Sequence, residues 1–156
     1  MSMLINAQFM TPLGGFEVCH DEHFIYQSSF KDLDDFPCDH PLSKQIEQEL
    51  SAYFKNPHHR FQLQLKPHGS SFQQKVWNAL RVIPAGRTLS YGELAHHLQT
   101  SPRAIGQACK TNKITLFIPC HRIVGKHNPG GFMGKEEALQ YKLNLLEHEQ
   151  GYPFRK

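Results

Sequence analysis

The sequence predicts an α+β fold in which a strand-rich first part is followed by a helical second part. Three observations predict it: short strand-like segments in the first 28 residues, apolar residues at helical spacing after Pro41, and Ser-x-x-Gln or Ser-x-x-Glu capping signals after Ser70. The chain has 156 residues, 39% of them hydrophobic. This length excludes a large multidomain enzyme or a long repeat array, and the composition argues against intrinsic disorder.

Three strands are expected first, because turn signals at residues 11–14 and 20–22 divide this region. The expected strands are residues 4–9, 15–20 and 24–28, which together form an antiparallel meander. An acidic loop follows at residues 32–39, and Pro41 can then open a helix with one apolar face. That face consists of Leu42, Ile46, Leu50, Tyr53 and Phe54.

A further strand is expected at residues 61–65, because Phe61, Leu63 and Leu65 alternate with polar residues. This strand could close the first structural unit. We therefore predict a small α+β domain over residues 1–67 and a second domain over residues 68–156.

The second domain is expected to begin with helices. Overlapping capping boxes at residues 70–74 precede a helix that ends near Ile83-Pro84. Its apolar stripe is Phe72, Val76, Trp77 and Leu80. A further capping box at residues 90–93 opens a helix to about Leu98, and a short turn then leads to a helix that starts at Pro102 and ends near Thr111. Two short helices joined in this way resemble a helix-turn-helix.

The outward face of the last helix carries Arg103, Gln107 and Lys110, at i, i+4 and i+7. Residues 1–56 contain 3 basic and 9 acidic residues, a net charge of −6, whereas the remainder has 14 basic and 5 acidic residues, a net charge of +9. A basic helical face of this kind favours nucleic acid as a partner. A solvated basic face on an ordinary pair of packed helices is the alternative interpretation.

Beyond this helix pair, the apolar run at residues 114–118 predicts a buried strand that ends before Pro119. A glycine-rich loop at residues 128–134 is expected to wrap closely around a neighbouring group. The last helix is expected over about residues 135–149.

Cys120 is the candidate nucleophile. It follows Pro119 and precedes two cationic or titratable residues, His121 and Arg122, whose charge would lower the pKa of a thiol from about 8.5. A buried structural cysteine is the alternative. The four cysteines show no Cys-x-x-Cys spacing, which favours reduced thiols, and with no signal peptide or membrane span in the sequence a cytoplasmic location is expected.

The segment Pro119-Cys120-His121-Arg122-Ile123-Val124 resembles the signature of the O6-alkylguanine-DNA alkyltransferases, the methylated-DNA–protein-cysteine methyltransferases. The similarity runs from about Gly69 to Glu149. It includes blocks at residues 72–77, 83–86, 90–95 and 103–108, and Asn112 eight residues before Cys120. So many ordered blocks are specific to this family.

The resemblance implies a ribonuclease-H-like α/β N-terminal domain and a winged-helix-like C-terminal domain that holds the helix-turn-helix and the thiol. It implies a monomer that binds double-stranded DNA in the minor groove and flips the damaged base into a pocket. The alkyl group of O6-alkylguanine would pass irreversibly to the cysteine, making the protein a single-turnover methyltransferase without a cofactor. O4-alkylthymine remains open as a second substrate.

The resemblance also implies roles for individual residues. Cys120 would accept the alkyl group, His121 would take the thiol proton through a water, Glu149 would orient His121, and Asn112 would brace the turn. Substrate and DNA contacts are implied for Tyr91, Arg103, Gln107, Lys110, Arg122, Ile123 and Lys142. Among these, Tyr91 would donate to the base, Arg103 would fill the gap in the stack, and the carbonyls of Cys120 and Ile123 would accept from the guanine amino group.

Three departures from the family pattern bear on these implications. Lys113 stands where the family usually has proline, and the loop between residues 130 and 142 is longer than usual. Cys19, His20 and Cys38 do not reproduce the zinc ligands of some relatives, so we expect no metal. The alternatives are a helix-turn-helix or damage-sensing protein that transfers nothing, against which Cys120 argues, and a thiol hydrolase, which leaves the basic helices unexplained.

Overall fold

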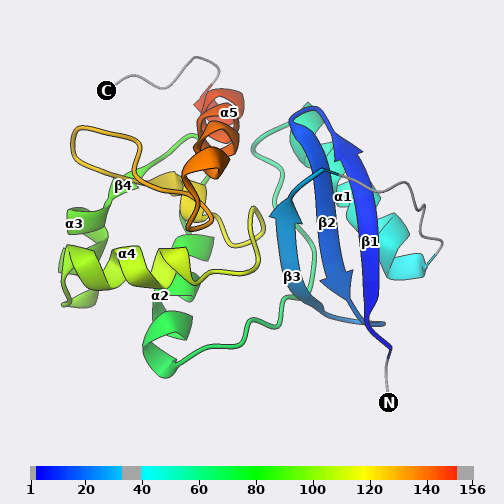
Figure 1. Cartoon of the computed structure of the whole chain (residues 1–156), viewed down its shortest axis with the longest axis horizontal. Coiled ribbons are helices and arrows are strands. Elements are labelled where there is room, and N and C mark those ends of the chain that lie inside the picture. Colours follow the sequence, from blue (N-terminus) through cyan, green and yellow to red (C-terminus); the bar gives the residue numbers. More distant parts are fainter. Residues whose placement is uncertain (1–2, 33–39, 151–156) are drawn as a thin grey trace. The chain divides into compact units, whose positions relative to one another are not determined.

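The computed structural model describes residues 3–32 and 40–150, and Figure 1 shows the arrangement of its elements. The expected acidic loop lies almost entirely outside these ranges, as does Cys38. The chain divides into two compact units, one of residues 1–68 with 113–117 and the other of residues 69–112 with 118–156. A single boundary after residue 67 does not describe the return of segment 113–117 to the first unit.

A three-stranded antiparallel sheet forms the frame of the first unit, and the predicted meander is confirmed. The strands are β1 (Ile5–Thr11), β2 (Gly14–His20) and β3 (Ile25–Phe30), paired in the order β1-β2-β3. Phe16 lies opposite Phe9 on one side and Phe30 on the other, and it is fully buried. Because side chains alternate across a strand, such pairs place one apolar face of the sheet in the core.

Helix α1 (Pro41–Lys55) begins where the sequence predicted it and packs against β1. The His40 side chain accepts a hydrogen bond from the Leu42 amide, and proline occupies the first helical turn, where its missing amide proton is not needed. The predicted apolar face is buried at Leu42, Ile46, Leu50 and Tyr53, whereas Phe54 is only half-buried.

The strand expected at residues 61–65 is wrong. Leu65 makes a single parallel bridge with Ile25, and within residues 3–32 and 40–150 the rest of the segment pairs with no strand. The physical reason lies at Gln62, whose amide donates to Glu49 of α1 and whose carbonyl accepts from Gln45 of the same helix. These backbone groups bond to helix side chains instead of a neighbouring strand.

Segment 113–117 contributes to the same core but is not the predicted five-residue strand. The Ser28 amide donates to the Lys113 carbonyl (2.9 Å) and the Thr115 amide to the Ser28 carbonyl (3.2 Å), which form one parallel bridge. Leu116 then takes a positive φ of 76°, and extended backbone cannot continue through it. The burial predicted for this segment is confirmed, while its strand character is limited to isolated bridge residues at Ile114, Thr115 and Ile118.

Three capped helices open the second unit: α2 (Ser71–Arg81), α3 (Tyr91–Leu98) and α4 (Pro102–Lys110). The capping boxes predicted at Ser70 and Ser90 are both present, and Ser101 caps α4. Each cap satisfies amide protons that a helix start leaves unpaired. The Trp77 ring of α2 donates to the Ala108 carbonyl of α4 (2.8 Å), but Phe72, predicted on the inner stripe, is 37% exposed.

The segment that carries Cys120 follows these helices. It comprises the 3₁₀ turn η1 (Cys120–Arg122) and the two-residue strand β5 (Ile123–Val124), which pairs in parallel with β4 (Leu89–Ser90). The chain ends in the 3₁₀ turn η2 (Glu136–Ala138) and helix α5 (Leu139–Gln150), so the last helix starts four residues later than predicted. Among residues 3–32 and 40–150, no helix has the length and apolar character needed to cross a membrane.

Buried His20 links sheet and helix in the first unit. Its Nδ1 lies 2.7 Å from the Asp21 carbonyl and its Nε2 lies 2.7 Å from the Ser43 hydroxyl. Since a carbonyl can only accept, Nδ1 carries the proton and the Ser43 hydroxyl donates to Nε2. Burial lowers the pKa of His20 from its ordinary 6.5, although the hydrogen bond to the Asp21 carbonyl opposes this.

We predict that His20 makes the protein less stable in acid. The unfolded chain binds a proton on this ring at a higher pH than the folded chain, so its contribution is complete above about pH 6.5 and is lost as the pH falls through the folded pKa. Urea unfolding of wild type and His20→Gln from pH 8 to pH 5 should show a weaker dependence on pH in the variant. An unchanged slope, or an equal change in the control His97→Gln at an exposed position, would contradict this prediction.

Candidate active site

Cys120 lies in η1 and is 6% exposed. Its turn is held by hydrogen bonds from the Cys120 amide to the Ile118 carbonyl (2.8 Å) and from the Arg122 amide to the Pro119 carbonyl (3.0 Å). The buried Asn112 side chain donates to the same Ile118 carbonyl (3.0 Å). Asn112 therefore supports the backbone of the turn that carries the thiol.

Electrostatics at Cys120 differ from the sequence-based prediction. Burial raises the pKa of the Cys120 thiol, and the hydrogen bond with Asn112 and the charge of Lys142 offset only part of that rise. The predicted lowering by the adjacent cationic side chains is wrong, because the loss of solvation disfavours the thiolate more than its neighbours favour it. A group that removes the proton is therefore needed for nucleophilic attack.

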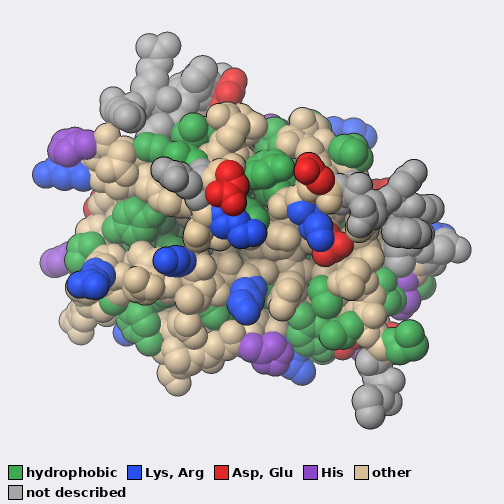
Figure 2. All heavy atoms as spheres, viewed as in Figure 1, with side chains coloured by type: hydrophobic (Ala, Val, Ile, Leu, Met, Phe, Trp, Pro, Cys, Tyr) green, Lys and Arg blue, Asp and Glu red, His purple; other side chains and the backbone are tan. Residues whose placement is uncertain are grey.

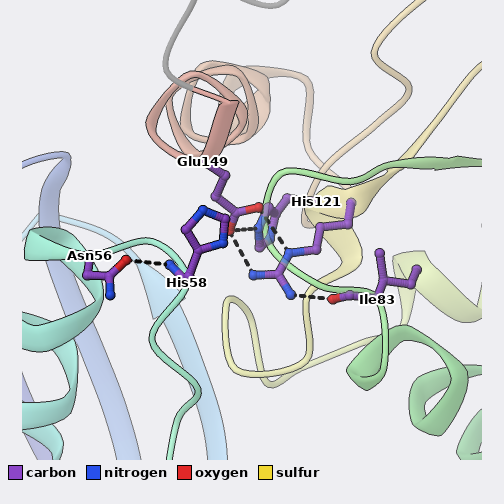
Figure 3. A network of polar contacts seen from close by, with 6 residues as sticks. Asn56, His58, Ile83, His121 and Glu149 are labelled. Atoms are coloured by element: carbon purple, nitrogen blue, oxygen red, sulfur yellow. Dashed lines mark hydrogen bonds and ion pairs between the residues drawn. The ribbon is translucent and has the colours of Figure 1, made fainter.

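His121, the next residue after Cys120 in the sequence, shares a buried network with Glu149 (Figure 3). His121 Nε2 lies 2.8 Å from Glu149 Oε2, and both side chains are almost fully buried. Burial disfavours the Glu149 carboxylate, but its interactions with His121 and Arg122 outweigh that effect and hold its pKa below the ordinary value. Glu149 is therefore ionised.

Burial lowers the pKa of His121 despite the neighbouring carboxylate, and Arg122 adds to the lowering. Neutral His121 must carry its proton on Nε2, because the Glu149 carboxylate there can only accept. Nδ1 is buried and has no hydrogen-bond partner among the residues that the structure describes. Its lone pair is available to accept a proton, which is the property of a general base.

Arg122 has a role that the sequence analysis did not assign. Its Nε and Nη2 donate to the two oxygens of Glu149 at 3.0 and 2.9 Å, and its Nη1 donates to the Ile83 carbonyl at 2.6 Å (Figure 3). All three guanidinium nitrogens are thus engaged within the second unit. These contacts give Arg122 a structural part as a counter-charge to Glu149, and the predicted contact of Arg122 with substrate or DNA stays a prediction.

A pocket of about 380 Å³ opens beside Cys120. Its walls come from α3, α4, η1 and residues 131–135, most of which belong to the glycine-rich loop. Tyr91, Cys109 and Lys110 are the helical side chains that line it. The volume falls in the range of small-molecule sites, so the pocket can take a nucleobase-sized ligand next to the thiol.

Lys142 fixes the loop wall of this pocket. Its buried Nζ donates to the carbonyls of Ile123 (2.6 Å) and Gly131 (3.0 Å), and burial lowers its pKa to about 8. Gly130 has a φ of +76°, and a Cβ there would lie 2.5 Å from the Tyr91 hydroxyl, so the loop passes Tyr91 at a distance that only glycine allows. The close wrapping predicted for this loop is confirmed. The Ile123 carbonyl, expected to accept from guanine, accepts here from Lys142.

Comparison with known proteins decides the family. The model of the 6-O-methylguanine DNA methyltransferase DNA-binding domain matches residues 71–151. A methylated-DNA–protein-cysteine methyltransferase of Methanosarcina acetivorans is 33% identical over 152 residues, covering 92% of this chain and 96% of that protein. This chain belongs to the methylated-DNA–protein-cysteine methyltransferase family. The constitutive enzyme of Bacillus subtilis is 39% identical over 109 residues, 67% of this chain and 66% of its own length.

Solved structures of this methyltransferase family have the same fold. The O6-methylguanine methyltransferase of Mycobacterium tuberculosis superposes with a TM-score of 0.81 at 29% identity, over 96% of this chain and 94% of that one. The OGT of the same organism, solved in complex with DNA, has a TM-score of 0.79 at 29% identity, over 94% and 93% of the two chains. The mixed α and β composition predicted from the sequence is confirmed by this likeness.

Two groups of predicted site residues lie apart from the network around Glu149. Arg103, Gln107 and Lys110 are exposed on α4, and Figure 2 shows basic but no acidic side chains over that helix in this view. Tyr91 stands at the start of α3, and its ring centroid lies 6.0 Å from Lys142 Nζ. Cys109 of the pocket wall is not among the predicted site residues, and no sequence signal marks it as part of the site.

No three His, Cys, Asp or Glu side chains in residues 3–32 and 40–150 are grouped so that they could hold a metal ion. Cys38, one of the residues considered for zinc, lies outside these ranges. The expectation that this methyltransferase relative uses no metal therefore stays a prediction.

We predict that Glu149→Gln destabilises the protein by about 3–5 kcal/mol, because it leaves the largely buried Arg122 guanidinium without a counter-charge. Denaturant unfolding at neutral pH measures this cost. Lys31→Gln, which breaks an exposed ion pair with Glu17, should cost less than about 1 kcal/mol. Equal losses of stability in the two variants would show that the buried ion pair contributes no more to the free energy of unfolding than the exposed one.

Proposed function

We propose that this protein repairs DNA by transferring the alkyl group of O6-alkylguanine to Cys120. The observation that carries the proposal is a buried thiol that opens into a base-sized pocket, adjacent in sequence to a neutral histidine whose free nitrogen can accept a proton. Family membership supports it, as does the relative solved with DNA. The chain retains the cysteine that a protein binding damage without transfer would not need.

Proton removal from the thiol comes first. Nδ1 of His121 accepts the Cys120 proton through a water, and the imidazolium that forms is stabilised by the carboxylate of Glu149. Because Glu149 is held ionised by Arg122, its charge is present before the thiol loses its proton. Because this negative charge is already in place, the free energy of forming the imidazolium and the thiolate is lowered while the sulfur stays shielded from solvent.

Alkyl transfer then takes place in one displacement. The Cys120 sulfur forms a bond to the alkyl carbon while the bond from that carbon to guanine O6 breaks, and the electron pair leaves with guanine. Burial raises the pKa of Tyr91, which keeps its proton available for donation to the departing base. The thioether that forms does not hydrolyse, so each molecule acts once.

Recognition of DNA is proposed for the α3–α4 pair acting as a helix-turn-helix in the minor groove of a duplex. Arg103, Gln107 and Lys110 on the exposed face of α4 supply the contacts. We assign a ribonuclease-H-like form to the first domain and a winged-helix-like form to the second, and we propose that the protein acts as a monomer. Because the acceptor must remain a thiol, the reducing cytoplasm is the proposed compartment.

We predict the addition of one methyl group, on Cys120 alone, when the protein is mixed with an oligonucleotide containing O6-methylguanine. Intact-protein and peptide mass spectrometry measure it. Cys120→Ser should bind the same oligonucleotide without repairing it, since the hydroxyl is a far weaker nucleophile. Steady multiple turnover, or methylation of Cys109 in the wild type, would refute the assignment of the acceptor.

We predict that Arg103→Ala slows transfer from duplex DNA by about tenfold or more, because unstacking a base costs a few kcal/mol and the arginine would fill the gap. Transfer from free O6-benzylguanine should change by less than about twofold, since that substrate has no stack to break. The rate constants for the two substrates distinguish an effect on base flipping from an effect on alkyl transfer. Equal losses on both would mean that Arg103 supports the fold of the site instead.

A further inference from the structure

A second cysteine lines the pocket of the acceptor. Cys109, near the end of α4, and Cys120, in η1, both contribute to the walls of the same 380 Å³ pocket. Both are free thiols. The transfer mechanism uses Cys120 alone and gives Cys109 no part.

Hydrogen bonds tie the backbones of the two cysteines together. The Asn112 amide donates to the Cys109 carbonyl (3.2 Å), and the Asn112 side chain donates to the Ile118 carbonyl (3.0 Å). The Cys120 amide donates to that same Ile118 carbonyl (2.8 Å). Three hydrogen bonds thus connect the end of α4 to the acceptor turn, although ten residues separate the cysteines in sequence.

The sulfurs also interact electrostatically. Burial raises the pKa of Cys109 to about 12, the charge of Cys120 adds to the rise, and Lys142 opposes it. Lys142 also favours the thiolate of Cys120. The ammonium of Lys142 therefore favours the thiolate form of both cysteines.

We infer that Cys109 is a resolving thiol that joins Cys120 in a reversible disulfide when a small peroxide enters the pocket. The Cys120 thiolate attacks one oxygen of hydrogen peroxide, the oxygen–oxygen bond breaks, and a sulfenic acid and hydroxide result. Cys109, as its thiolate, attacks the Cys120 sulfur and displaces hydroxide. Two thiols and one peroxide thus give one disulfide and two waters, with the two thiol protons ending in water.

This reaction would protect the acceptor. A sulfenic acid without a nearby thiol is oxidised further to sulfinic acid, which dithiols do not reduce, whereas a disulfide returns to two thiols with a dithiol reductant. The expectation that the disulfide blocks alkyl transfer rests on the proposed function, but the expectation that it forms does not.

The full-length protein is treated with hydrogen peroxide and divided between peptide mass mapping and transfer from an O6-methylguanine oligonucleotide. In the wild type, the peptides of Cys109 and Cys120 should become linked with loss of two hydrogens, and transfer should fall about tenfold or more and return after dithiothreitol. Cys109→Ser should instead gain two oxygens at Cys120 and fail to recover. Each variant is compared with its own untreated activity.

Cys19→Ser is the matched control, since it removes a partly exposed thiol of β2 in the first unit, and it should behave as the wild type does. Cys109→Ala, together with thermal unfolding of both Cys109 variants, tests whether the serine hydroxyl or misfolding causes the difference. Sulfinic acid at Cys120 of the wild type with Cys109 reduced, or a disulfide to any other cysteine, overturns the inference. Absence of transfer by the untreated wild type would refute the proposed function and leave the disulfide measurement intact.

Discussion

The ionised carboxylate of Glu149 is the constraint on which the acceptor site depends. A charge buried among apolar groups is tolerated only when it is paired and hydrogen-bonded, and Arg122 and His121 supply those partners. The pairing fixes the end of α5 to the 3₁₀ turn of Cys120, and Arg122 extends it to the Ile83 carbonyl after α2. Three separate parts of the second unit are therefore positioned by one side chain.

Burial of the Cys120 thiol limits its reaction with electrophiles from solution. Since burial raises the pKa of Cys120, little thiolate is present in the free protein, and a passing electrophile meets mostly the unreactive thiol. In the proposed mechanism, the free nitrogen of His121 and the charge of Lys142 favour the thiolate inside the pocket, where a bound base would exclude water. Reactivity is thereby coupled to occupation of the site.

Local signals in the sequence predicted much of this fold. The capping boxes at Ser70 and Ser90 and the proline at the start of α1 act within one helical turn, so their structures follow from nearby residues. The alternating segment 61–65 was misassigned because alternation reports which side chains are buried and says nothing of whether a neighbouring strand exists. Segment 114–118 was predicted as a strand from its apolar run, which indicates burial but does not reveal the positive φ of Leu116 that interrupts the extended backbone.

In the candidate site, too, the sequence identified residues but not all of their interactions. Neighbouring residues mark Cys120 as the candidate nucleophile, and the family resemblance adds His121, Asn112 and Glu149, whose roles stay predictions compatible with the hydrogen bonds of His121 and Asn112. The role of Arg122 could not be predicted, because it depends on a carboxylate 27 residues later in the chain. The direction of the Cys120 pKa shift depends on burial, which adjacent residues do not reveal.

Segment 113–117, which belongs to the first unit, limits where the chain can be divided into parts that fold separately. Phe117 packs edge-on against both Phe16 and Phe61, so the first unit completes its aromatic core with a residue from the middle of the second unit's sequence. Cutting the chain or its gene after residue 68 would leave one fragment with a gap in its core and the other with a stretch of apolar side chains lacking their partners. A recombinant of two relatives would therefore keep this core intact only if residues 1–68 and residues 113–117 came from the same parent.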